Sequence, residues 1–278
     1  MGIYELQDVS SESPNMIHMR TIDYFDPKIL VTAFSWHPNG TAIGMTHTSG
    51  DLCLAPYTEE SSKEDPHHVQ VWQHSLEAWT LAFLPDGSGV LSGADDSTLQ
   101  FTELPRSPVE AIDGSVAEPE YISTRRARWV DERTHGAGVT AILPVHCDDA
   151  GIFIVTGSYD DRIRLIYATS TGRRKSLAEL NLEGGVWRVK ILDTKHASGI
   201  TTSLPGECLL LVSCMHAGAR IVKLSRKEDE WQFEVLAKFE EHKSMNYGSD
   251  SQTGINERGQ RTIVSTSFYD RLLCLWRY

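Results

Sequence analysis

The sequence has no long apolar run and no closely paired cysteines. No stretch approaches the roughly 18 apolar residues of a membrane span, so we expect no membrane-embedded segment. Its five cysteines are scattered without C-x-x-C spacing, which favours reduced thiols over a disulfide framework or a zinc site. The first residues lack a basic start followed by an apolar stretch, so no signal peptide is visible and we expect a cytoplasmic protein.

An excess of basic residues is also missing. The chain carries 26 Lys and Arg against 38 Asp and Glu, a net charge of −12. Such a negative field disfavours a general nucleic-acid binder, which needs a basic face. The basic clusters RRARW at 125–129 and RRK at 173–175 are therefore interpreted as solvated loops. We expect neither nucleic acid nor a membrane as a partner.

A hairpin motif recurs along the chain. GSYDDRIRL at 157–165, SFYDRLLCLW at 267–276 and SGADDSTLQF at 92–101 each place an aspartate before an alternating strand. An aspartate in such a turn is typical of the hairpin in a β-propeller blade, where the carboxylate accepts hydrogen bonds from turn amides. A motif that recurs indicates a repeat architecture.

Turn residues and alternating apolar segments divide the 278 residues into five blade-like units, which predicts an all-β propeller formed by one domain. An irregular segment at 1–30 precedes these units, which are 31–57, 70–102, 134–168, 184–224 and 241–278. The polar segments are expected to protrude as loops, at 58–68, 103–133, 193–208 and 249–261. An open ring leaves unpaired sheet edges, so we expect an N-terminally incomplete version of a seven-bladed ring.

Aligning the five hairpins predicts which residues hold the blades together. The equivalent hairpin positions are Thr48, Asp95, Asp160, His216 and Asp270. Three units open on a histidine, at His74, His135 and His242. In WD-type blades a histidine at this point commonly ties its loop to the hairpin aspartate. These three histidines and the three aspartates are therefore predicted to be structural rather than chemical.

Segments outside the repeat resemble one family of WD-repeat proteins. LEGGVWRVKI at 182–191, SCMHAGARIVKL at 213–224, and the MNYG and STSFYDRLLCLW segments near the C-terminus are similar to diagnostic segments of the diphthine methylesterase family. The family also carries the older name diphthine methyltransferase. HSLEAW at 74–79 and TGSYDDRIRL at 156–165 fit the same family in the same order. The resemblance extends over residues 70–278.

The resemblance implies an esterase of diphthamide biosynthesis. Its substrate would be the methyl ester of diphthine, the modified histidine of translation elongation factor 2, and the products would be methanol and a carboxylate. Elongation factor 2 would then be the partner, and no cofactor is expected. A non-catalytic WD-repeat scaffold that docks protein partners remains the alternative, because most propellers have that use. A methyl-lysine reader is a third interpretation.

Recognisable catalytic signatures are absent, since the chain contains neither G-x-S-x-G nor H-E-x-x-H. An ester could still be attacked by a side-chain nucleophile, or by water that a general base activates. Cys214 and His216 would share one face of a strand and could form a nucleophile–base pair if the thiol were exposed. Alternatively, Cys214 is a core residue and His216 a turn anchor. Glu77 is the next candidate base.

Aromatic residues near the predicted inner strands are the candidate substrate-binding set. Diphthine carries a quaternary trimethylammonium group, and aromatic faces bind such cations. Ordinary blade packing is the alternative for each ring. Arg188 could hold a carboxylate or be a structural arginine of the rim, and Gly184 and Gly185 could bring backbone close to a ligand or simply open an inner strand. The aromatic residues, expected to meet at the mouth of the central channel, are Trp79, Tyr159, Trp187, Tyr247 and Tyr269.

Overall fold

A computed structural model describes residues 2–7, 15–57, 67–104, 126–194 and 206–278. These residues form antiparallel sheets and contain no α-helix. In the same part of the chain, no helix is long and apolar enough to cross a membrane.

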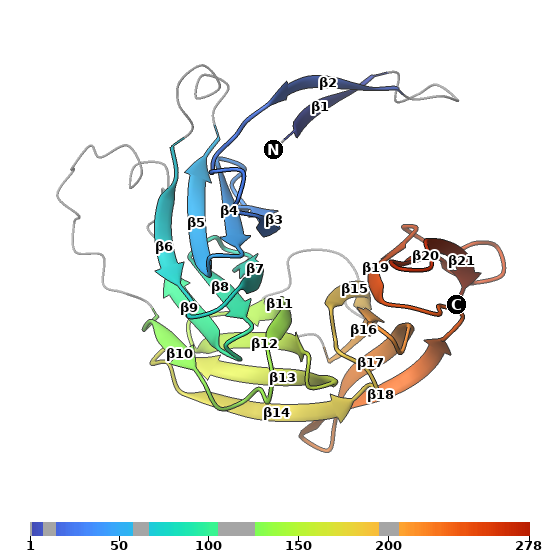
Figure 1. Cartoon of the computed structure of the whole chain (residues 1–278). Helices are drawn as coiled ribbons and strands as arrows, with labels where there is room; N and C mark the ends of the chain where they lie inside the picture. The colour runs from blue at the N-terminus through green and yellow to red at the C-terminus, as the bar shows by residue number, and fades with distance from the viewer. Residues whose placement is uncertain (1, 8–14, 58–66, 105–125, 195–205) are drawn as a thin grey trace.

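Five sheets stand side by side in an arc, each one a blade (Figure 1). The first comprises β3 (Val31–Trp36), β4 (Ala42–His47), β5 (Asp51–Pro56) and β6 (Val69–Gln73). The second comprises β7 (Ala78–Phe83), β8 (Gly89–Ala94), β9 (Leu99–Glu103) and β10 (Trp129–Asp131). The third comprises β11 (Val139–Cys147), β12 (Gly151–Ser158), β13 (Arg162–Thr169) and β14 (Arg174–Asn181).

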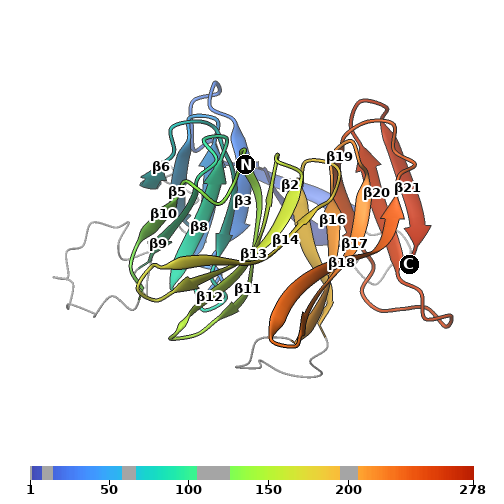
Figure 2. The ribbon, with the colours of Figure 1, turned by 90° about the horizontal axis from the view of Figure 1, so that it is seen from below.

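The fourth sheet comprises β15 (Arg188–Thr194), β16 (Glu207–Ser213), β17 (Ala219–Lys227) and β18 (Glu230–Phe239). The fifth has three strands, β19 (Asn246–Ser251), β20 (Thr262–Ser267) and β21 (Leu272–Arg277). The innermost strands contact one another in the order β3, β7, β11, β15, β19, and the first and last sheets stand at opposite ends of the arc (Figures 1 and 2). The predicted five-bladed all-β propeller is confirmed.

The hydrophobic core lies in the slots between neighbouring blades. Leu91 and Leu99 of the second sheet, for example, pack with Ile154 and Ile166 of the third. Where the slots narrow, glycine is required. A Cβ on Gly157 would lie 2.2 Å from Cγ1 of Val186, and one on Gly93 would lie 2.6 Å from Cγ1 of Val139. In the second and third blades, the glycine of the hairpin motif therefore lets the next blade approach.

The predicted blade boundaries miss the outer strands. β6 completes the first blade, although the sequence analysis assigned residues 70–73 to the second unit. β10 lies within the predicted loop 103–133, and β14 lies between two predicted units. β19 extends into the predicted loop 249–261, and the ends of β15 and β16 overlap the loop 193–208. The other predicted loop residues at 58–66, 105–125 and 195–205 lie outside the described residues.

The N-terminal residues are more regular than expected. β1 (Gly2–Gln7) and β2 (Asn15–Thr21) form an antiparallel two-stranded ribbon that extends from the first sheet (Figure 1). The ribbon exposes several apolar side chains, among them Tyr4, Leu6 and Met16. The segment that the sequence analysis described as irregular therefore contains two regular strands, formed by its short alternating pieces.

The same pair of contacts joins loop to hairpin in three blades. In each, the imidazole Nε2 of the opening histidine forms a hydrogen bond with a hydroxyl of the second strand: His74 with Ser92 (2.8 Å), His135 with Thr156 (2.9 Å) and His242 with Ser265 (2.8 Å). The hairpin aspartate instead accepts from the amide that follows the histidine: Asp96 from Ser75 (2.9 Å), Asp160 from Gly136 (2.8 Å) and Asp270 from Lys243 (3.1 Å).

Two predicted hairpin positions are wrong by one residue. Gly93 pairs with Leu99, as Gly157 pairs with Ile163, so the hairpin centre is Asp96 and not Asp95. In the first blade, the pairing of β4 with β5 centres on Ser49 and not on Thr48. Asp95 therefore does not anchor the second blade.

The basic clusters are part of the fold. Arg126 is buried and donates to Oγ of Ser88 at 2.8 Å and to the carbonyl of Asp148 at 2.9 Å. Arg174 on β14 donates to the carbonyl of Val130 at 3.0 Å. For these arginines the prediction of solvated loops was wrong, because their guanidinium groups satisfy backbone carbonyls between strands.

Candidate site at the mouth of the channel

The candidate site is built where inner strands begin and hairpins turn. Trp79 is the second residue of β7. Arg188 is the first residue of β15, and Trp187 directly precedes it. Tyr247 lies near the start of β19. Tyr159 lies in the turn from β12 to β13, next to the anchoring Asp160. The second, third, fourth and fifth blades thus each contribute one aromatic ring to the site.

Trp187 is the centre of the aromatic cluster. Its ring centroid lies 5.6 Å from that of Trp79, 5.9 Å from that of Tyr159 and 4.9 Å from that of Tyr247. All three ring pairs are tilted rather than stacked. The structure therefore brings four of the five predicted aromatic residues into direct contact.

Tyr269 joins this cluster only through a neighbour. Its ring contacts Phe268, with centroids 5.1 Å apart, and Phe268 contacts Tyr247 at 5.9 Å. The side chain of Tyr269 is 71% exposed. Phe268 was missed in the sequence, although it stands within the SFYD segment.

Arg188 lies on the channel side of the cluster. Its Cζ lies 4.9 Å from the centre of the Trp187 ring, and one terminal nitrogen donates to the carbonyls of Thr140 (3.0 Å) and Trp187 (2.8 Å). Burial lowers the pKa of Arg188. The residue also lines a hollow of about 350 Å³ between the inner strands, together with Thr80. These contacts favour the structural interpretation of Arg188.

Cys214 and His216 do not form the predicted pair on a strand. β16 ends at Ser213, so Cys214 follows the strand and His216 lies in the hairpin turn. Cys214 is 0% exposed, and burial raises the pKa of its thiol to about 12, which disfavours the reactive thiolate. These facts favour the core interpretation of Cys214. His216 is exposed and has no hydrogen bond or ring contact with another residue of the described part of the chain.

Gly184 and Gly185 make room for a neighbouring turn. A Cβ on Gly184 would lie 2.5 Å from the carbonyl oxygen of Cys214, and one on Gly185 would lie 2.6 Å from Sδ of Met215. Both glycines are buried. The close approach that they permit is therefore to the hairpin of the fourth blade, which sets the position of Trp187 two residues later.

Asp95 is the site residue that the sequence analysis missed. One carboxylate oxygen accepts a hydrogen bond from Nε1 of Trp79 at 2.7 Å, and its backbone amide donates to the carbonyl of Glu77 at 2.9 Å. Burial raises the pKa of Asp95 more than the Trp79 hydrogen bond lowers it, and the carboxylates of Glu77 and Asp96 raise it further. The available signal was the pair of adjacent aspartates in the ADDS sequence, of which only one can occupy the hairpin centre.

Tyr159 shares the environment of this carboxylate. Burial raises the pKa of Tyr159, and the negative charge of Asp95 adds to the effect. A Cβ on Gly138 would lie 2.7 Å from Oδ1 of Asp95 and 2.9 Å from Cδ2 of Tyr159, so both groups lie against the same glycine. Asp95 therefore stands between Trp79 of the second blade and Tyr159 of the third.

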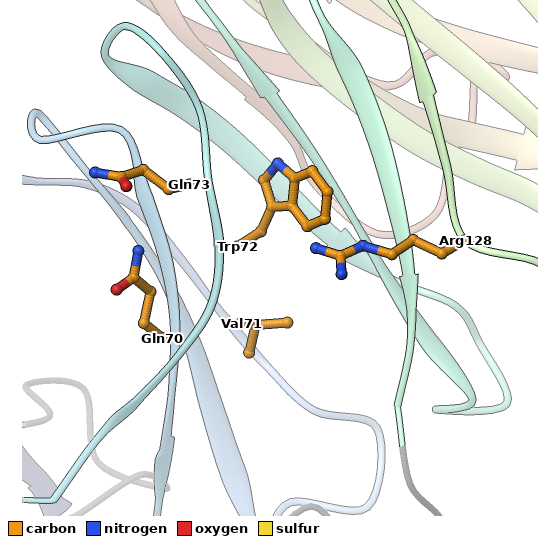
Figure 3. A pocket seen from close by; sticks show the side chains of 5 residues that line it. All are labelled: Gln70, Val71, Trp72, Gln73 and Arg128. Carbon is orange, nitrogen blue, oxygen red and sulfur yellow. The ribbon is translucent and has the colours of Figure 1, made fainter.

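A second hollow lies elsewhere, on the outer strand of the first blade. It has a volume of about 310 Å³ and is lined by Gln70, Val71, Trp72, Gln73 and Arg128 (Figure 3). The Cζ of Arg128 lies 3.2 Å from the centre of the Trp72 ring. No predicted site residue lies here. Within the described residues, no group of three or more His, Cys, Asp or Glu side chains could hold a metal ion.

Comparison with known proteins first defines the class. Residues 67–101 match the family described as WD domain, G-beta repeat. A chain of the Mitotic Checkpoint Complex has a similar structure (TM-score 0.53, 14% identity, 100% of this chain and 83% of that one), as do the RRP9 WD40 repeats (TM-score 0.55, 12% identity, 91% and 65%). Together with the repeated histidine and aspartate contacts, this makes the chain a WD-repeat β-propeller.

Sequence relatives narrow the class. The chain is similar to proteins named Diphthine methyltransferase from Schizosaccharomyces pombe (26% identity, 94% of this chain and 68% of the relative), Saccharomyces cerevisiae (29%, 85% and 59%) and Homo sapiens (26%, 90% and 50%). The resemblance seen in the sequence is thus confirmed. The chain spans between half and about two thirds of the length of these three relatives.

Proposed function

We propose that the chain hydrolyses the methyl ester of diphthine on translation elongation factor 2, in the cytoplasm. The observation that carries the proposal is the aromatic cluster around Trp187 with two carboxylates, Asp95 and Glu77, at its edge. Aromatic faces and carboxylates are the groups that bind a quaternary ammonium ion, and diphthine carries one next to its ester. The names of the sequence relatives support the same substrate.

Hydrolysis needs a base for water and a donor for the developing oxyanion. Water would attack the ester carbonyl carbon while the base accepts its proton, and the bond from that carbon to the methoxy oxygen would break. The leaving methoxide would take up a proton and depart as methanol. His216 and Glu77 are the two candidate bases, and Arg188 is a cation beside the Trp187 ring.

The test is the mass of the modified elongation factor. We expect incubation with the purified chain, without any methyl donor, to remove the mass of one CH2 group from methylated diphthine and to release methanol. A gain of that mass on demethylated diphthine, dependent on an added methyl donor, would show methyl transfer instead. Binding of elongation factor 2 without any mass change would favour the scaffold alternative.

Single substitutions distinguish the two bases. If His216 is the base, His216→Ala should lower turnover by at least about 100-fold and leave folding nearly intact, because its side chain is exposed. If turnover stays near the wild-type value, Glu77→Gln becomes the decisive variant. Retention of turnover by both variants would exclude both residues as the base.

A further inference from the structure

The aromatic cluster carries two carboxylates near Trp79 and one guanidinium, that of Arg188, beside Trp187. The carboxylate of Glu77 is close enough to raise the pKa of Asp95, and Asp96 follows directly. Asp96 is satisfied by hydrogen bonds from the amides of Ser75 and Thr98. Within the described residues, neither Asp95 nor Glu77 forms an ion pair with a lysine or arginine. A partly buried carboxylate without a cation is costly unless something else supplies the positive charge.

The Asp95 carboxylate and three aromatic rings contact one another in sequence, so that the four side chains form a ring of contacts. Asp95 accepts from Trp79, and the Trp79 ring contacts that of Trp187. The Trp187 ring contacts that of Tyr159, which lies against Gly138 beside the Asp95 carboxylate. Three aromatic walls and one carboxylate wall are the composition of a cage for an alkylated ammonium ion.

The carboxylate is held in place for such a role. Nε1 of Trp79 fixes one oxygen of Asp95, so the other oxygen remains as an acceptor or counter-charge. The backbone of Asp95 is fixed by its hydrogen bond to Glu77 and by the adjoining anchor at Asp96. A pre-positioned charge loses little freedom when a ligand binds.

We infer that Asp95 is the anionic wall of this cage and gives the site its preference for a permanent cation over a neutral group of the same shape. Aromatic walls alone would accept either, because they also offer apolar contact. The assignment rests on the proposed function only for the natural ligand, since binding of a cation requires no ester chemistry. Its test can therefore fail or succeed independently of the esterase.

The experiment compares choline with 3,3-dimethylbutan-1-ol, its neutral isostere, by NMR titration of the tryptophan indole N–H signals. We expect the wild-type protein to bind choline about tenfold more tightly than the isostere, with a shift of the Trp79 signal. Asp95→Asn, which keeps an acceptor for Trp79, should abolish this preference. Glu77→Gln should reduce it less.

Asp229→Asn is the matched control, because Asp229 lies in the distant turn between β17 and β18 and also loses one charge. This control should retain the full preference. Equal binding of the two ligands by the wild-type protein, or choline binding that leaves the Trp79 signal unchanged, would overturn the inference even if Asp95→Asn failed to fold. Retained choline preference in folded Asp95→Asn would overturn it too. If Asp95→Asn loses the preference and the wild-type protein cannot demethylate diphthine, the cage is upheld and the esterase is refuted.

Discussion

At the scale of the residue, His135 couples stability to pH. Burial lowers its pKa from 6.5 to about 4, and the nearby positive charge of Arg164 contributes. The unfolded chain therefore takes up a proton at a pH where the folded protein does not. Stability from this residue is complete above pH 6.5 and is lost as the pH falls toward 4, by an amount on the order of 3 kcal/mol.

Urea unfolding between pH 7 and pH 4 measures this coupling. His135→Gln should flatten the fall in the free energy of unfolding across that range, although it lowers stability at pH 7 by removing the bond to Thr156. His18→Gln, on the exposed N-terminal ribbon, should leave the pH dependence unchanged. An unchanged slope in His135→Gln would mean that other groups cause it.

Trp187 makes the second prediction at this scale. Because its ring contacts three other aromatic rings, Trp187→Leu should weaken the binding of choline by about tenfold, the value of one desolvated cation–π contact. Isothermal titration calorimetry measures the dissociation constant. Trp36→Leu, at a half-exposed tryptophan on β3, is the control and should bind as the wild type does. An unchanged affinity in Trp187→Leu would remove the cluster from the binding site.

Single residues also mark the limit of what the sequence could predict. The aromatic set was identified because its members flank the repeated motifs, but Asp95 was taken as the hairpin anchor in place of Asp96. The two are identical neighbours, and only the pairing of Gly93 with Leu99 decides which one occupies the hairpin centre. Cys214 was misplaced for a related reason, since the sequence does not show that β16 ends one residue before it.

At the scale of the element, the hairpin of β12 and β13 depends on Asp160. Its carboxylate accepts from the amide of Gly136 and from two nitrogens of Arg164, at 3.0 and 2.7 Å. Arg164 is buried, so Asp160→Ala would leave its charge with only Glu179 as a partner. We expect a loss of about 3–5 kcal/mol in the free energy of unfolding, measured by urea denaturation.

Asp149→Ala is the control for this hairpin. Asp149 is exposed in the turn before β12, and its substitution should change stability by less than about 0.5 kcal/mol. A variant Asp160→Ala with wild-type stability and no activity would contradict the structural role and assign the carboxylate to chemistry.

The strands differ in how clearly the sequence pattern predicts them. The second and third strands of the first four blades are largely buried and apolar, so alternation and turn residues revealed them. Two of the outer strands give a weak pattern: β10 has three residues, and β14 mixes charged, polar and apolar side chains. Their position depends on pairing with β9 and β13, which no local pattern encodes.

At the scale of the whole molecule, the arc presents an apolar strand at one end. Leu273 and Leu275 of β21 point to one face and are 67% and 65% exposed. Exposed apolar edge strands promote association. Replacing both leucines with lysine should reduce concentration-dependent association in static light scattering without lowering the melting temperature. Equal association of the double variant and the wild type would show that another surface is responsible.

The pairing of anchor and neighbour within each hairpin has a consequence for how this molecule can change over time. Asp96, Asp160 and Asp270 fasten their blades. In the first two hairpins the residue immediately before the anchor, Asp95 or Tyr159, contacts the aromatic cluster, and in the third the exposed Tyr269 contacts Phe268. One position keeps the architecture, and under the proposed cage the adjacent position would set the ligand chemistry. Substitutions at the second position can therefore explore new specificities while the scaffold beneath them stays intact, which makes the hairpins natural starting points for redesign.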